Sequence, residues 1–302
     1  MRETLHAYMK VGIVHFMAYP QTVKGDGPIV ETVRRIAEDD FFSAIEITTV
    51  KEPKAREEVA RILEEGHLVV GYGAQPILLT RKLNLNAFES SERAQAVQAV
   101  KEAVDEAYTL GAGSLAVLSG PDPGERREEA MRLLVQSLTE ICAHAKSKGS
   151  LRIVLETFDQ KIDKRCLIGP HKDAVKVSAE VRKACPHFGL MLDLSHLPLQ
   201  GETPQEAFQA ARDHVAHIHI GNCVKKEGHP AYGDQHPRFG LPGGENDVPQ
   251  VAEFLRELFQ IGYLGEGKRP IVAFEVKPLP GESSELVIAG AKRTLVEAWS
   301  QL

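Results

Sequence analysis

Cysteine is scarce in this chain of 302 residues, which contains four cysteines and no Cys-x-x-Cys pair. The four are scattered at Cys142, Cys166, Cys185 and Cys223. A chain of this length can bury a core without cross-links, so we do not expect a disulfide framework. The pattern is typical of reduced, mostly structural thiols in a cytoplasmic protein.

Long apolar runs and an excess of one charge are also missing. No stretch approaches about 18 uninterrupted apolar residues, so we expect no membrane span. The opening segment MRETLHAYMKVGIV lacks the apolar region of a signal peptide. The formal net charge of −6 argues against a broad surface for nucleic acid or an anionic membrane. We therefore expect a cytoplasmic protein whose partner is a small molecule, with no nucleic acid and no membrane.

The glycine-rich signatures of nucleotide binding are absent as well. No Gly-x-Gly-x-x-Gly turn follows the first expected strand, and no Walker-type loop occurs. No linker, low-complexity tract or short repeat divides the sequence. We expect a single domain over residues 1–302.

Short apolar runs that alternate with amphipathic segments fill the sequence instead. The expected strands are Val11–Phe16, Ala44–Thr48, Leu68–Tyr72, Ser114–Leu118, Arg152–Thr157, Phe188–Leu194, Val215–Ile220 and Ile271–Val276. The expected helices are Pro28–Glu38, Lys54–Glu65, Ser91–Leu110, Glu125–Lys148, His171–Ala184, Thr203–Asp213, Val248–Ile261 and Ser283–Ser300. Eight strand–helix units in about 300 residues predict an α/β fold, a single (β/α)8 TIM barrel, with an open doubly wound sheet as the second choice.

Each of the four late strands ends in a residue type that binds metals. RIVLETFD contains Glu156, FGLMLDLSH contains Asp193, VAHIHIGN contains His219, and PIVAFEVKP contains Glu275. Each shares a strand face with the residue two positions earlier, which is apolar before all three carboxylates. This is the layout of an inward-facing stack with a polar rim, and the carboxyl-terminal rim of a barrel is where active sites form.

Three carboxylates on one rim would repel each other strongly, and burying them singly is costly. A divalent cation removes this conflict, and three carboxylates with one imidazole suit Mn2+, Mg2+, Co2+ or Zn2+. Each acid alone could equally be a solvated strand-end residue, but four on consecutive strands favour a shared site. We therefore predict one divalent metal ion as the cofactor.

Further polar residues lie near the ends of other strands and in the long segment 221–247. His15 and Glu46 lie at the ends of the first two strands and Gln75 follows the third, and each could bind substrate hydroxyls or bond to the rim. His217 lies two residues before His219 on the same strand face and is interpreted as a residue that supports a ligand or packs in the core, not as a ligand itself. The segment Asp234-Gln235-His236 could place two side chains on one side, which would suit a substrate site or a second metal.

Together these residues resemble the xylose isomerase-like TIM barrels, a superfamily of sugar epimerases and isomerases, inosose dehydratase and endonuclease IV. The resemblance runs from Val11 to about Leu295, and LPGGENDVPQVAEFLRELFQIGYLG is similar to the family's glycine-rich loop and seventh helix. The resemblance implies the metal ligands Glu156, Asp193, His219 and Glu275. It also implies that His196 contacts a substrate hydroxyl or carbonyl and that Asp234 and His236 line the site.

The implied reaction is isomerisation or epimerisation of a small sugar or ketose by proton transfer through a metal-stabilised enediolate. The resemblance assigns the two proton transfers to Glu156 and Glu275 as catalytic residues. The same enediolate could expel a hydroxyl, which would make the chain a metal-dependent polyol or keto-inositol dehydratase. The sequence GNCVKK after strand seven lacks the arginine of ketose epimerases, so the dehydratase stays open.

Two readings from other classes are less favoured. An endonuclease IV-like hydrolase would need histidines after strands two to four, where this chain has Glu46, Gln75 and Ser119-Gly120. In a non-enzymatic binding barrel, Glu156 and Glu275 would have no catalytic role. Barrels of this family often pair, so a homo-oligomer is compatible with the resemblance.

Overall fold

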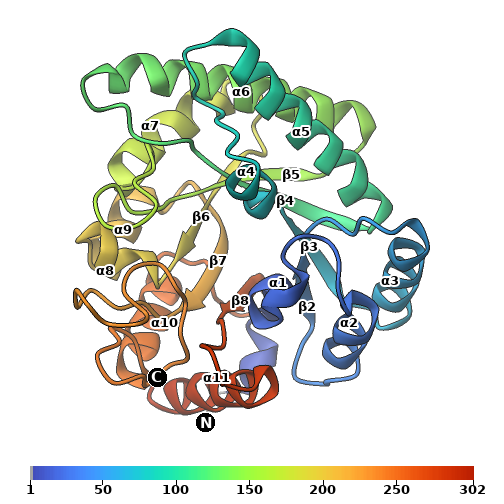
Figure 1. The fold of residues 1–302 in the computed structure, drawn as a ribbon. Coiled ribbons are helices and arrows are strands. Elements are labelled where there is room, and N and C mark those ends of the chain that lie inside the picture. The colour runs from blue at the N-terminus through green and yellow to red at the C-terminus, as the bar shows by residue number, and fades with distance from the viewer. Residues whose placement is uncertain (1–2) are drawn as a thin grey trace.

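Eight short parallel strands form one sheet whose two ends meet, in a computed structural model that describes residues 3–302 (Figure 1). The strands are β1 (Lys10–Ile13), β2 (Ala44–Ile47), β3 (Val69–Gly73), β4 (Ala112–Leu118), β5 (Arg152–Glu156), β6 (Gly189–Asp193), β7 (Val215–Gly221) and β8 (Ile271–Glu275). Their order is β1-β8-β7-β6-β5-β4-β3-β2, and a parallel bridge between Val14 and Glu46 joins the first strand to the second. The predicted (β/α)8 barrel is confirmed.

The helices follow the strands along the chain: the longer ones surround the sheet on its outer face, and two short ones, His15–Ala18 and Gln75–Thr80, lie toward the middle of the view in Figure 1. They are α1 (His15–Ala18), α2 (Ile29–Ala37), α3 (Pro53–Glu65), α4 (Gln75–Thr80), α5 (Ser90–Thr109), α6 (Arg127–Lys148), α7 (His171–Arg182), α8 (His196–Gln200), α9 (Pro204–Ala211), α10 (Val248–Gln260) and α11 (Ser284–Ser300). Three short 3-10 helices add to them: η1 (Leu5–Ala7), η2 (Pro20–Thr22) and η3 (Gly124–Arg126). In the described part of the chain, no helix has the length and apolarity needed to cross a membrane.

One predicted strand end is wrong. His15 and Phe16 were expected in the first strand, but that strand stops at Ile13 and α1 begins at His15. The backbone still reaches Val14, whose N–H donates to the carbonyl of Phe274 at 2.9 Å. The chain then turns into a helix, and the imidazole of His15 lies against Thr32 of α2.

Two layers of different character fill the inside of the barrel. A small apolar cluster of Ala116, Val154 and Met191 comes from three neighbouring strands. Two residues further along β5 and β6, on the same face, are Glu156 and Asp193. The change from apolar to ionisable side chains thus falls at the carboxyl ends of the strands, as the strand pattern predicts.

Candidate metal centre and substrate cavity

The four side chains at the ends of β5 to β8 converge inside the rim. Glu156, Asp193, His219 and Glu275 each offer one ligand atom, and these atoms lie within 4.8 Å of one another. All four residues are buried. The sequence therefore identified side chains that the fold does bring together.

Two oxygens of this quartet have no hydrogen-bond partner. They are Oε1 of Glu156 and Oδ2 of Asp193, and both are buried. A buried carboxylate oxygen without a partner is costly, because it has lost water and gained nothing in return. A divalent cation would satisfy both atoms, and three carboxylates with one imidazole are a common donor set for such an ion. The residues present therefore fit a divalent metal.

The two glutamates of the quartet have opposite electrostatic environments. Burial, and then the negative charge of Glu275, raises the pKa of Glu156 above its ordinary value. Burial opposes ionisation of Glu275 as well, but His236 and His219 together hold its pKa well below the usual range. Carboxyl groups whose pKa values are driven apart are suited to separate acid and base roles.

A second cluster adjoins the quartet. Nε2 of His196 lies 3.0 Å from Oδ1 of Asp234, and Nε2 of His236 lies 2.8 Å from the same oxygen. Lys164 neutralises the other oxygen of Asp234 at 3.1 Å. Asp193 joins the two clusters, because it also lies within 4.8 Å of ligand atoms of His196 and His236. The three residues that were expected to line the site therefore lie beside the candidate ligands.

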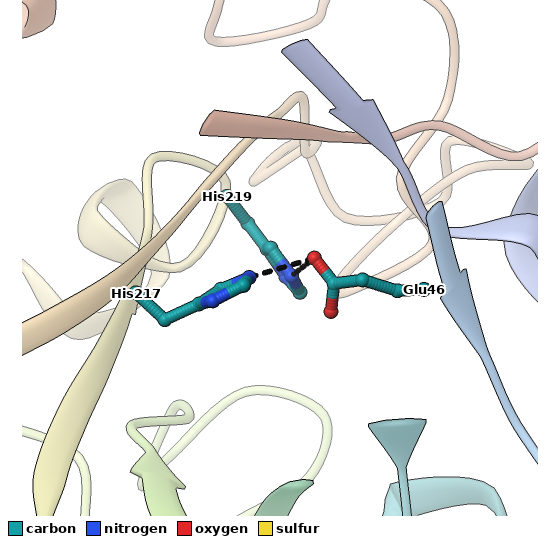
Figure 2. A group of neighbouring side chains, drawn as sticks. All are labelled: Glu46, His217 and His219. Carbon is teal, nitrogen blue, oxygen red and sulfur yellow. Dashed lines mark hydrogen bonds and ion pairs between the residues drawn. The ribbon is translucent and has the colours of Figure 1, made fainter. Parts of the chain in front are cut away.

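The early strands contribute in three different ways. Gln75 begins α4, and its Nε2 donates to Oε2 of Glu156 at 2.7 Å. Glu46 of β2 points toward His217 and His219 and contacts both (Figure 2). His15 is not brought to the cluster, since its Nε2 shares a hydrogen bond with the hydroxyl of Thr32 at 2.7 Å. Burial in this apolar setting lowers the pKa of His15 to about 3.

A cavity of about 220 Å³ opens above these residues. Its polar lining comprises Gln75, Glu156, Lys164, His219, Asp234, Gln235, His236, Glu275 and Lys277. Phe16, Met17, Val23, Leu79 and Phe158 are among its apolar lining residues. A pocket of this size suits a small molecule, with polar groups at one end and an apolar wall that excludes water.

Sequence reasoning missed two lysines of this cavity. Lys277 follows Glu275 by two residues, so strand alternation could have identified it. Lys164 gave no such signal, because a loop positions it. The carboxylate of Asp159 accepts hydrogen bonds from the backbone N–H groups of Ile162, Asp163 and Lys164, and this turn directs the lysine toward Asp234.

The long segment after β7 is anchored at several points. The side-chain amide of Asn246 donates to the carbonyls of Leu194 and Gly221, at 3.2 and 3.0 Å. The backbone N–H of Lys277 donates to the carbonyl of His236 at 2.7 Å. These bonds fix Asp234 and His236 to the ends of β6, β7 and β8.

Fold and site together define a (β/α)8 barrel with a candidate metal centre at its carboxyl-terminal rim. The chain belongs to the xylose isomerase-like TIM barrel family, whose model matches residues 33–285. No curated protein sequence matches the chain.

Several solved structures share this fold at low sequence identity. A D-tagatose 3-epimerase-like protein is 19% identical, with a TM-score of 0.71 over 97% of this chain and 99% of that one. An IOLI protein with a binding zinc atom is 18% identical, with a TM-score of 0.74 and the same coverage. A D-allulose 3-epimerase from Methylomonas sp. is 19% identical, with a TM-score of 0.66 over 98% of this chain and 97% of that one.

Proposed function

We propose that this chain is a divalent-metal-dependent isomerase or epimerase of a small sugar or ketose. The observation that carries the proposal is the buried quartet of Glu156, Asp193, His219 and Glu275, which has two unpartnered carboxylate oxygens and three members that line a small cavity. Sugar epimerases among the structural neighbours support the same class. Such reactions remove a proton beside a carbonyl and return it to another face or atom.

The cation would be held by all four residues of the quartet. When bound, it would act as a Lewis acid on the carbonyl and adjacent hydroxyl oxygens and so neutralise the charge of an enediolate. The proton transfers fall to the chain's own carboxylates. Glu156 and Glu275 both line the cavity, so one is placed to accept the substrate proton while the other returns one.

Neighbouring residues would orient the substrate and the two glutamates. Gln75 fixes one oxygen of Glu156 and leaves the other without a hydrogen bond. His236 and Lys277 line the same cavity and can bind substrate hydroxyls. Apolar residues such as Phe16 exclude water, which protects a reactive enediolate from side reactions.

A dehydratase is the second candidate, because the first residues after β7, from Asn222 to Lys226, contain no arginine to hold a ketose. The two reactions share proton removal and differ in the next step. A dehydratase product has lost one water, whereas an epimer or isomer keeps the mass of its substrate. An endonuclease is not proposed, because the cavity is small. In addition, β2 to β4 contain no histidines that could join His196 and His236 in binding further zinc ions.

The test begins with metal analysis of the purified chain, followed by a panel of ketoses and keto-inositols in deuterated water. We expect a divalent ion, and a product of unchanged composition that carries solvent deuterium at the reacting carbon. Glu275→Gln serves as the blank, because it keeps the shape of the side chain and removes its charge. Turnover that persists fully in this variant would contradict the two-glutamate mechanism.

A further inference from the structure

A polar trio of Glu46, His217 and His219 adjoins the quartet and shares His219 with it. Glu46 reaches across the interior from β2 toward His217 and His219 of β7, as Figure 2 shows. Oε1 of Glu46 lies 2.7 Å from Nε2 of His217 and 2.9 Å from Nε2 of His219. All three residues are buried, so water does not weaken these contacts.

His219 has a carboxylate at each of its two nitrogens. Its Nδ1 faces the quartet, 2.7 Å from Oε2 of Glu275 and 3.7 Å from Oε1 of Glu156. Its Nε2 faces Glu46 on the other side. A neutral imidazole offers a lone pair at one nitrogen and a proton at the other. With a cation held by the quartet, the acceptor at Nε2 would keep the proton there and leave the lone pair of Nδ1 for the cation.

His217 fixes this acceptor in place. An ionised carboxylate only accepts hydrogen bonds, and the same oxygen of Glu46 is approached by Nε2 of both histidines. The two donors hold the carboxylate from adjacent positions of one strand face, which leaves it little freedom to rotate. The contact with His217 therefore holds the carboxylate of Glu46 in the orientation that it needs to accept a hydrogen bond from His219.

The backbone beside Glu46 is shaped for this arrangement. The β2–β3 register pairs Glu46 with Gly71, and a Cβ on Gly71 would lie 2.9 Å from Cγ of Glu46. That distance is shorter than ordinary van der Waals contact, so any larger residue would displace the glutamate. Glycine at this position lets the side chain cross the barrel.

We propose that Glu46 is a positioning residue, which sets the orientation and the protonated nitrogen of the metal ligand His219, while His217 holds Glu46 in place. This inference rests on the proposed metal centre. Separations of 2.7 and 2.9 Å are hydrogen-bond distances, and Nδ1 of His219 already faces the quartet, so the trio supports an ion site and does not form one of its own.

The first experiment measures the affinity of the metal-free chain for Zn2+ and Mn2+ by competition with a chelator. We expect Glu46→Gln to bind either ion about 10- to 100-fold more weakly than wild type, the usual effect of losing the outer partner of a metal-binding histidine. His217→Gln should lose less, because Glu46 then keeps its contact with His219. Thermal unfolding of each metal-free variant separates this effect from a change in stability.

Asp105→Asn is a matched control. Asp105 of α5 lies 2.8 Å from Nε2 of His144 of α6, so this substitution also breaks a carboxylate–histidine pair, but one between two outer helices. We expect its metal affinity to stay within about twofold of wild type, by the usual independence of distant sites.

The second experiment uses wild type alone and does not depend on any variant folding. In the chain saturated with Zn2+, 15N-histidine NMR should show His219 protonated at Nε2 and coordinating through Nδ1. The reverse arrangement would overturn the inference.

The other outcomes are also decisive. Equal affinity of wild type and Glu46→Gln would refute the role of Glu46 while leaving the metal centre intact. Loss of one whole equivalent of metal in Glu46→Gln, with the remaining ion bound as before, would show that the trio is itself an ion site. A wild-type chain that binds no divalent ion would refute the proposed function and this inference with it.

Discussion

Strands β5 to β8 end in side chains that lie close to one another, whereas the early strands and the short helices that follow them supply side chains that contact these four or line the cavity. Gln75 bonds to Glu156, Glu46 bonds to His219, and Phe16 forms part of the cavity wall. The two halves therefore have different tasks on the same scaffold. The late half would bind an ion and move protons, and the early half would orient the ligands and exclude water.

Removal of the ion should have the largest effect, because it acts on the late half as a whole. We expect a chelator to abolish turnover while the barrel stays folded, since the quartet caps a core that strands and helices build. Turnover and circular-dichroism melting at the same chelator concentration provide the measurement. If the fold were lost together with the metal, the ion would be part of the core and the division between the halves would not hold.

Substitution of a single late-strand ligand should have the second-largest effect. Asp193→Asn keeps an oxygen that can accept the 2.7 Å hydrogen bond from the N–H of Ser195, but it removes the charge. We expect metal affinity and kcat/KM to fall by more than ~100-fold, because even outer partners of ligands contribute about 10- to 100-fold. Asp213→Asn on the exposed surface is the control. A fall of less than tenfold would remove Asp193 from the ligand set.

An early-half residue should have a smaller effect of a different kind. Gln75→Leu removes the 2.7 Å hydrogen bond to Glu156, and hydrogen bonds to charged groups contribute about 1.5–3 kcal/mol. We expect kcat/KM to fall by about 10- to 100-fold while the metal content per chain stays that of wild type. Loss of the metal in this variant would show that the early half also holds the ion. Gln98→Leu on the exposed face of α5 should leave both quantities unchanged.

Substitution of His15 should change neither the metal affinity nor turnover. It should change only the free energy of unfolding at acid pH. Its pKa is about 3 in the folded chain against 6.5 for the exposed group, so below pH 6.5 the unfolded chain binds the extra proton. Its contribution to stability is complete above pH 6.5 and is lost as the pH falls toward 3, by up to about 1.4 kcal/mol per pH unit. His15→Gln should flatten this part of the curve, measured by urea unfolding between pH 4 and 7. An unchanged slope would mean that His15 is not a source of acid sensitivity.

Most of the architecture could be read from the sequence, because strands buried on both faces appear as apolar runs between amphipathic helices. The short helices α4 and α8, with six and five residues, were not predicted, since neither completes a recognisable periodic pattern. The end of β1 was misplaced for a related reason. His15 and Phe16 continue an apolar run, and only the contact between His15 and Thr32 shows that the chain has already turned.

The site was partly accessible in the same way. Strand ends identify Glu156, Asp193, His219 and Glu275, because all parallel strands of a barrel deliver their carboxyl ends to one rim. Strand patterns do not specify contacts across the barrel, so they could not show that Glu46, expected to bind substrate hydroxyls or bond to the rim, contacts His219. Lys164 depends on the turn that Asp159 organises, and such side-chain-to-backbone bonding leaves no periodic trace.

Gly71 carries no functional group, yet the position of Glu46 depends on the absence of a side chain there. A methyl group there would lie too close to Cγ of Glu46 and would displace the glutamate. Its carboxylate would then no longer hold the imidazole of His219 in place. Even Gly71→Ala, the smallest substitution possible there, would then change the affinity of the site for its ion. Any redesign of this barrel for another ion or substrate must therefore keep that empty volume as carefully as it keeps the ligands.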